Sequence, residues 1–158
     1  MNAIAVGVDV SKGKSMVTAL RFPLEMVVEP YEIRHTENGL NNFVALLSRL
    51  DGNVRVVVES TGHHHAPVVE ALYEAGIFVS VVNPKVVSKF RDVALRQVKT
   101  DKQDAITLAR YGLKYWEDLR AFSPVDTLRR RLKECSRQYH LYTDAKIKLK
   151  NNLVALLD

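Results

Sequence analysis

The sequence has little cysteine, few glycines and no long apolar run, and these shortages exclude several kinds of protein. Its one cysteine, Cys135, rules out an internal disulfide and a cysteine metal cluster. No apolar stretch approaches the ~20 residues that a membrane-spanning helix needs. The first ten residues lack the basic segment and small-residue cleavage site of a signal peptide. We therefore expect a cytoplasmic protein without a membrane partner.

The 158 residues suffice for one domain, or one domain with an appendage, and charge is divided unevenly along them. Residues 1–84 hold six Lys/Arg and nine Asp/Glu, whereas residues 85–158 hold seventeen and nine. A basic half favours a polyanion partner, because bound Lys and Arg release counterions from phosphates. The alternative is an ordinary solvated helical surface. The localisation of the positive charge favours nucleic acid.

The hydrophobic pattern predicts an α/β fold. Residues 3–10 alternate, with Ile4, Val6 and Val8 on one face of a strand and small residues with Asp9 on the other. The apolar run within 53–61 is typical of a strand buried on both faces. The other expected elements are strands at 15–22, 29–36 and 78–83, and helices at 37–50, 65–76 and, as two segments, 86–116. This order predicts a mixed sheet of five strands with helices on both faces.

The C-terminal part has a different pattern. Residues 118–126 have the composition of a linker, and we expect one long helix from Thr127 onward. Its apolar residues recur at coiled-coil spacing, at Leu128, Leu132, Cys135, Tyr139, Tyr142, Leu149, Leu153 and Leu156. The sequence stops at Asp158 on this register. We therefore expect the helix to pair with another chain, as in a homo-oligomer, or the chain to be the front part of a longer protein.

Two acidic residues stand at the ends of predicted buried strands. Asp9 lies near the end of the first strand, and Glu59 ends the run VRVVVE. A buried carboxylate is costly unless it is paired or bound to metal. A right-handed crossover would make these strands neighbours, and catalytic groups of open α/β sheets gather at the carboxyl ends of the strands. Asp9 and Glu59 are therefore candidates for a cation site.

Asp101 and Asp104 are candidates for the rest of this site. They lie in the first turn of a predicted helix, where Thr100 and Gln103 have capping-box spacing, so the alternative is two ordinary first-turn acids. Oxygen ligands without cysteine favour Mg²⁺ or Mn²⁺, and four clustered carboxylates would repel one another without a cation. Two ions in such a site can act on phosphodiester bonds. The basic residues around it are Lys85, Lys89, Arg91, Arg96, Lys99 and Lys102.

Three motifs resemble the N-terminal domain of DEDD-type insertion-sequence transposases, a group that includes the Piv DNA invertases. They are VGVDVSKGKSMV around Asp9, VVVESTGHHHAPVVEAL around Glu59, and VNPKVVSKFRDVALRQVKTDKQDAITLARYG around Asp101 and Asp104. The resemblance implies a RuvC-like, ribonuclease H-like catalytic domain over residues 1–122 and the start of a coiled-coil segment over 123–158. It also implies that the four acids are catalytic and hold two divalent ions for DNA cleavage and strand exchange.

The resemblance implies partners as well. These are DNA and, as in some members, a guide RNA that bridges target and donor DNA, with action at the bacterial nucleoid. Members carry a second domain after the long helices, with a serine thought to be the nucleophile. That domain is missing from these 158 residues, so we do not expect them to complete strand exchange alone.

Several further features have more than one interpretation. Lys12, Arg129, Arg130 and Arg131 are candidate nucleic-acid contacts, although the three arginines are also consistent with the polar face of a coiled coil. The GHHH motif at 62–65 favours a helix-start loop near phosphate over a zinc site. Two other functions stay open: a non-catalytic nucleic-acid-binding and dimerisation module, and an actin-like nucleotide-dependent kinase. Seven scattered glycines do not supply the second phosphate loop of such a kinase.

Overall fold

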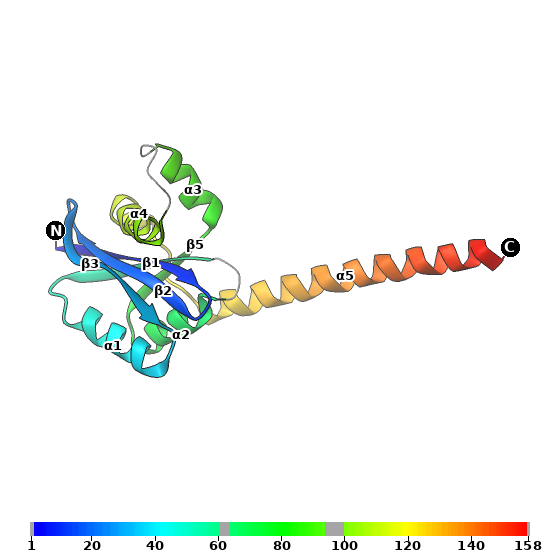
Figure 1. Ribbon diagram of the computed structural model, residues 1–158, viewed down its shortest axis with the longest axis horizontal. Coiled ribbons are helices and arrows are strands. Elements are labelled where there is room, and N and C mark those ends of the chain that lie inside the picture. Colours follow the sequence, from blue (N-terminus) through cyan, green and yellow to red (C-terminus); the bar gives the residue numbers. More distant parts are fainter. Residues whose placement is uncertain (1, 61–63, 94–99, 158) are drawn as a thin grey trace. The chain divides into compact units, whose positions relative to one another are not determined.

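The computed structural model describes residues 2–60, 64–93 and 100–157 (Figure 1). The chain divides into two compact units, residues 1–122 and 123–158. The second unit is the helix α5 (Pro124–Leu157). The first unit contains β1 (Ala3–Ser11), β2 (Lys14–Arg21), β3 (Glu25–Arg34), α1 (Glu37–Ser48), β4 (Asn53–Glu59), α2 (Ala66–Glu74), β5 (Phe78–Val82), α3 (Pro84–Val93), α4 (Asp101–Lys114) and a 3-10 turn at Trp116–Asp118.

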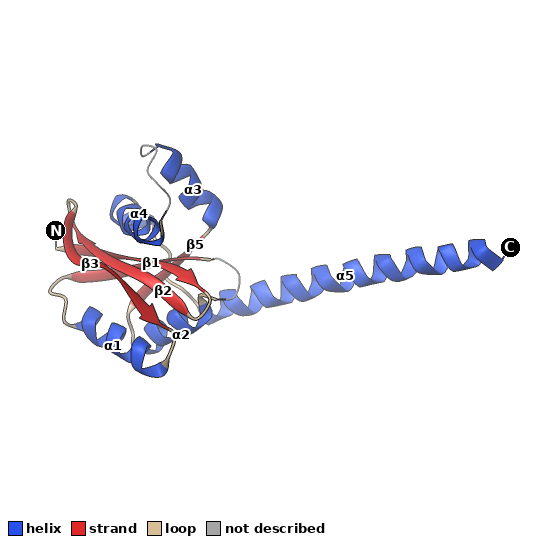
Figure 2. Cartoon of the chain, in the orientation of Figure 1, coloured by secondary structure: helices blue, strands red, loops and turns tan. Residues whose placement is uncertain are grey.

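The five strands form one mixed sheet in the order β3-β2-β1-β4-β5 (Figure 2). The first three strands pair antiparallel as two successive hairpins. β4 and β5 are then added parallel to β1, each after a helix. The predicted five-stranded α/β fold is therefore confirmed, including the adjacency of the first and fourth strands.

The alternation along β1 separates the two layers of the first unit. Ile4, Val6 and Val8 are buried in a core with Phe43 of α1 and Leu72 of α2. The small residues on the opposite face of β1 are covered by α4 and the 3-10 turn. Figure 2 shows α1 and α2 on one side of the sheet and α3 and α4 on the other. Branched apolar residues thus build the thicker core, and small residues admit a helix at close range.

The third strand differs from its predicted bounds. It begins at Glu25, four residues before the predicted start, because its pairing with β2 continues back to the turn, where Arg21 pairs with Glu25. The register is irregular between Val17 and Leu20 of β2. Pro30 lies inside β3, which is tolerated because β3 is an edge strand of the sheet.

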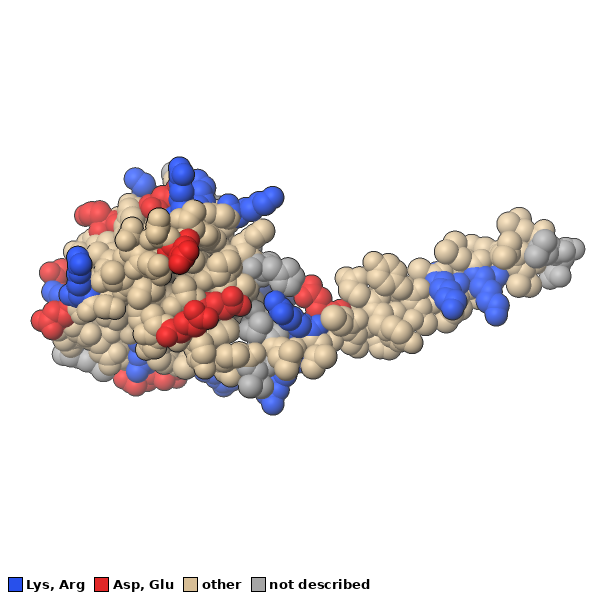
Figure 3. Space-filling model, turned by 90° about the horizontal axis from the view of Figure 1, so that it is seen from below, with Lys and Arg blue, Asp and Glu red and all other residues tan. Residues whose placement is uncertain are grey.

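Helix α5 begins at Pro124, three residues before its predicted start. Proline is favoured in the first turn of a helix, where its missing N–H has no partner to lose. Leu149, Leu153 and Leu156 are 69%, 59% and 83% exposed, so the predicted apolar register is uncovered within this chain. Figure 3 shows Lys and Arg side chains projecting from α5 between uncharged stretches. No helix in the described part of the chain is long and apolar enough to cross a membrane.

Candidate metal centre and nucleic-acid interface

Asp9 and Glu59 lie at the carboxyl ends of two neighbouring parallel strands. The register pairs Val8 of β1 with Val58 of β4, and the next residue on each strand is one of the two acids. Both acids are half-buried. By alternation they share the sheet face of Gly7, which is the face that α4 covers. The structure therefore brings Asp9 and Glu59 to the same end of the sheet.

Close contact between α4 and β1 determines where this helix begins. A Cβ at Gly7 would overlap the carbonyl oxygen of Ala105 and lie 2.6 Å from the Ala109 nitrogen, so a residue without Cβ is required. Further along the helix, a Cβ at Gly112 would lie 3.0 Å from the Cβ of Ala5. The helix therefore runs antiparallel to β1, and its first turn reaches the carboxyl end of that strand.

The first turn of α4 carries Asp101 and Asp104. The Thr100 Oγ1 accepts a hydrogen bond from the backbone N–H of Gln103 at 3.2 Å, which confirms the predicted N-cap. Asp104 is only 8% exposed, whereas Asp101 is exposed. The two acids thus differ in environment: Asp104 lies in the contact between helix and sheet, and Asp101 lies on its rim.

The four acids have the ligand chemistry of a hard-cation site, although their side chains do not form a ready-made cage. All supply carboxylate oxygens, which suit Mg²⁺ and Mn²⁺, and their elements meet at one end of the sheet. Within the described residues, no three Asp, Glu, His or Cys side chains are placed to hold one ion together. A shared ion would therefore require some of these carboxylates to turn toward one another.

Lys14, the first residue of β2, is a cation near these acids that the sequence motifs did not single out. Its Nζ lies 2.7 Å from the Oε2 of Glu32 on β3. The pKa of Lys14 is raised, mainly by its hydrogen bond to Glu32 and further by the negative charge of Asp101. The start of α4 therefore lies within electrostatic range of the β1–β2 turn. The strand alternation carried a signal, because Lys14 pairs with Ser11, two residues beyond Asp9 on the same face.

The predicted nucleic-acid contacts are spread over both units. Lys12 lies in the β1–β2 turn, two lysines lie in α3, and Lys102 lies in the first turn of α4. The side chains that the structure describes are all exposed, at Lys12, Lys85, Lys89, Lys102, Arg129 and Arg131. Arg96 and Lys99 lie outside the described residues, as do the side chains of Arg91 and Arg130.

His35 lies at the same end of the sheet as the four acids, on the face away from α4. The His35 Nε2 is 2.8 Å from the Oγ of Ser15, which is buried on β2. Burial lowers the pKa of His35, and the nearby His64 lowers it further. His64 belongs to the GHHH motif, whose first two residues, at 62 and 63, lie outside the described part of the chain. His35 and the motif are therefore spatial neighbours despite their separation in sequence.

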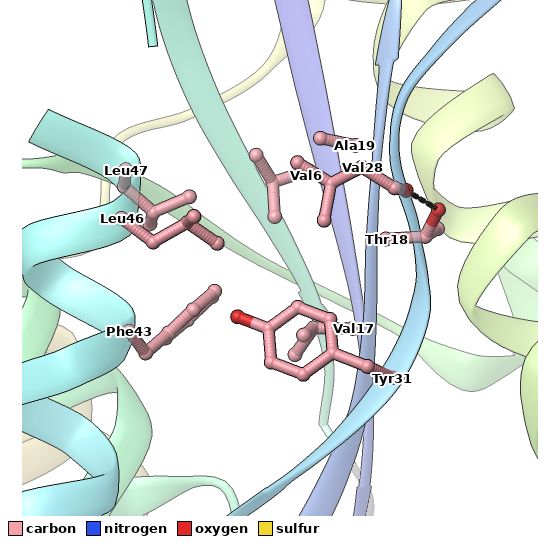
Figure 4. Close-up of a pocket in the computed structure, with 9 residues that line it drawn as sticks. All are labelled: Val6, Val17, Thr18, Ala19, Val28, Tyr31, Phe43, Leu46 and Leu47. Atoms are coloured by element: carbon pink, nitrogen blue, oxygen red, sulfur yellow. Dashed lines mark hydrogen bonds between the residues drawn. The ribbon is translucent and has the colours of Figure 1, made fainter. Parts of the chain in front are cut away.

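A small pocket between α1 and the β2–β3 hairpin belongs to the core rather than to a second site (Figure 4). The Thr18 hydroxyl donates a hydrogen bond to the Val28 carbonyl at 2.7 Å, and the Tyr31 hydroxyl points toward α1. The lining is otherwise aliphatic or aromatic, from Val6, Val17, Ala19, Val28, Phe43, Leu46 and Leu47. This lining offers no charged group to a ligand.

Two solved structures resemble the fold of this chain. The RuvC structure of Thermus thermophilus aligns with a TM-score of 0.53 and 14% identity, covering 75% of this chain and 98% of RuvC. The same protein in complex with a Holliday junction substrate aligns with a TM-score of 0.50 and 14% identity, over 76% and 99% of the two chains. The predicted RuvC-like fold is therefore confirmed.

Sequence comparison identifies the family. A Sinorhizobium fredii protein named as a transposase, y4uE, is 35% identical over 82 residues, which span 48% of this chain and 22% of that relative. The model of the DEDD transposase family of IS110 matches residues 6–158. This match takes in the strand-end acids, the capped start of α4 and helix α5. The chain therefore belongs to the DEDD transposase family of IS110.

Proposed function

We propose that this chain is the nucleic-acid-cleaving part of a DNA transposase or recombinase, with Asp9, Glu59, Asp101 and Asp104 as its metal ligands. The observation that supports this most is the seating of α4 on Gly7, because it directs a turn with two acids toward two acidic strand ends. Family membership supports the reaction class. Divalent cations bound there, one or two Mg²⁺ or Mn²⁺, would neutralise a phosphate and activate the attacking oxygen.

The acids would have different parts in this site. Asp9 and Glu59 would hold their ligand oxygens on strands, whose positions are determined by the sheet register. Asp104 would approach from the helix and, being buried, exclude water from that side. Asp101 is exposed and is the first residue of α4, directly after the N-cap Thr100. We therefore assign it the outer position in the site, toward the DNA.

Calorimetric titration with Mn²⁺ tests the metal site directly. We expect Mn²⁺ to bind the wild-type chain and to raise its unfolding temperature. Asp9→Asn and Glu59→Gln should each weaken Mn²⁺ binding at least 10-fold, while Glu70→Gln, an exposed acid on α2, should not. If the wild-type chain shows no Mn²⁺ binding, the catalytic proposal fails and a non-catalytic nucleic-acid-binding and dimerisation module becomes the better account. The observation that favours this second function is that no three acids among the described residues are placed to hold one ion together.

We propose DNA as the substrate, with a guide RNA as a second nucleic-acid partner. The solved RuvC complex contains a Holliday junction, and branched DNA is the corresponding substrate to test here. The y4uE match spans only 22% of that relative, so the activity of the whole protein is part of the proposal. A serine supplied by a further domain would attack a DNA phosphorus, and the bond from that phosphorus to one of its two sugar oxygens would break. We expect residues 1–158 to bind divalent metal and DNA, without strand exchange.

We also propose that α5 pairs with α5 of a second chain. Its apolar register at Leu149, Leu153 and Leu156 is exposed, and burying such a face is favourable by about 25 cal/mol per Å². Leu153→Asp should therefore shift the sedimentation coefficient to that of a monomer. Asn151→Asp introduces the same charge off this register and should leave the dimer intact. A monomeric wild-type chain at high concentration would exclude this pairing.

A further inference from the structure

We propose that Lys14 and Arg34, assisted by Lys12, bind the DNA backbone along the β1–β2–β3 side of the candidate metal centre. This goes beyond the basic residues of α3 and α4, because Lys14 and Arg34 lie on β2 and β3. It rests on the proposed function in one respect, that the polyanion is DNA. The inference places one strand of the DNA across the ends of three strands, next to Asp9 and Asp101.

Two rows of side chains at the carboxyl end of β1 carry this inference. The register pairs Asp9 with Met16, and Met16 with Glu32, which gives an inner row on the face covered by α4. Two residues nearer this end of each strand, an outer row pairs Ser11 with Lys14, and Lys14 with Arg34. The inner row contains acids, and the outer row contains the two cations. A phosphate on the outer row would therefore lie beside the acids.

The outer cations are available to a ligand. The side chains of Lys14 and Glu32 are 49% and 41% exposed, and ion pairs of this kind are weak enough to exchange partners with a phosphate. Arg34 and Lys12 are also exposed. The negative charge of Asp101 acts on Lys14, so this cation is close to the rim of the candidate site.

Lys12, Lys14 and Arg34 lie together, whereas the other Lys and Arg residues of 1–84 lie elsewhere. Residues 1–84 hold only six Lys/Arg, and three of them meet at this one end of the sheet. Of the others, Arg21 pairs with Glu25 at 3.3 Å, and Arg55 stacks on the Trp116 ring with its guanidinium 4.4 Å from the ring centre. Arg49 follows the last residue of α1.

Electrostatics explains why DNA would need these cations. Four carboxylates repel a phosphate backbone, and that repulsion is strongest before a metal ion binds. Lys and Arg at the rim offset it and add counterion release to the binding free energy. An acidic protein or a membrane surface would gain from the same cations, but neither would use the carboxylates beside them. A phosphodiester chain that also binds metal would use both groups.

The salt dependence of DNA binding tests this surface. The full 158-residue chain is titrated into a fluorescently labelled DNA duplex in EDTA at several NaCl concentrations, with anisotropy as the readout. Lys14→Gln and Arg34→Gln should each reduce the slope of log K against log salt by about 0.9, since each removes one phosphate contact. Arg49→Gln removes an exposed cation from the other end of the unit and should leave the slope unchanged. Glu32→Gln frees Lys14 and should tighten binding at low salt, about 2-fold or more.

The outcomes separate this inference from the proposed function. If Lys14→Gln and Arg34→Gln have the wild-type slope on DNA, the inference is wrong even when Mn²⁺ binds. If both lower the slope on DNA but no Mn²⁺ binding is found, the surface stands and the catalytic proposal fails. Weaker binding by Glu32→Gln would also contradict the inference. Circular dichroism of each variant checks that the sheet is intact.

Discussion

The two faces of β1 come from the same nine residues, yet one packs the core and the other positions a helix. The face toward α1 and α2 carries Ile4, Val6 and Val8, all at most 1% exposed, and packs them against large side chains. The face toward α4 carries Ala5 and Gly7, and there the helix backbone itself approaches the strand. The first face carries the larger apolar side chains, and the second determines where the acids of α4 lie.

This difference teaches which substitutions should act on stability and which on the site. A bulky core can lose a methyl group and relax partly, so the cost is spread over several neighbours. A glycine in contact with helix backbone has no such freedom, because the backbone cannot adopt another rotamer. Changes on the α4 face should therefore displace the whole helix, together with Asp101 and Asp104.

The largest effect is expected for Gly7→Val. The added side chain would overlap the Ala105 carbonyl and crowd the Ala109 nitrogen, so α4 must move away from β1. We expect a loss of about 4 kcal/mol or more in unfolding free energy, above the usual 1–3 kcal/mol of overpacking. Mn²⁺ binding should be lost as well. Urea denaturation and calorimetry measure the two effects.

If Gly7→Val folded with normal stability and bound Mn²⁺ normally, the proposed difference between the two faces of β1 would be wrong. The close approach of α4 would then not determine the position of the acids.

Phe43→Ala should have the next largest effect, on stability alone. Phe43 is 2% exposed and packs in the core on the α1 side of the sheet. Truncating a buried phenylalanine costs about 3–5 kcal/mol. The Mn²⁺ affinity of the folded fraction should stay within about 2-fold of wild type. A large loss of that affinity would mean that the two faces are not separable.

Much of this arrangement could be predicted from the sequence, for physical reasons that apply locally. The alternation of residues 3–10 gave both faces of β1, and the Thr100–Gln103 spacing gave the start of α4. The contact between Gly7 and Ala105 could not be predicted, because residues 98 apart meet only when the crossover is complete. The relation of Lys14 to Arg34 was missed for a similar reason: it depends on the register of an edge strand whose start was misplaced.

Thr100→Ala should have a smaller effect, confined to the α4 face. It removes the side-chain oxygen that accepts from the Gln103 N–H, and losing such a cap costs about 1 kcal/mol. Fraying of the first turn should affect Asp101 more than Asp104, because Asp104 is held by burial against the sheet. We expect Mn²⁺ affinity to fall about 3-fold. Thr100→Ser keeps the hydroxyl and should restore both quantities, and a failure to do so would assign the effect to the lost methyl group.

The smallest expected effect is a pH dependence on the α1 and α2 face, from His35. Burial and His64 hold the pKa of His35 in the folded chain below its ordinary value of 6.5. Between those two pKa values the unfolded chain binds more protons, so stability rises with pH through this window and is complete above about 6.5. Protonation would also leave Nε2 able only to donate to the Ser15 Oγ, 2.8 Å away. His35→Gln should flatten this rise in urea midpoint, whereas His140→Gln, exposed on α5, should preserve it. Because His35 lies on the face away from α4, the Mn²⁺ affinity of His35→Gln should equal that of the wild-type chain above pH 7. A different affinity there would show that His35 influences the acids on the other face of the sheet.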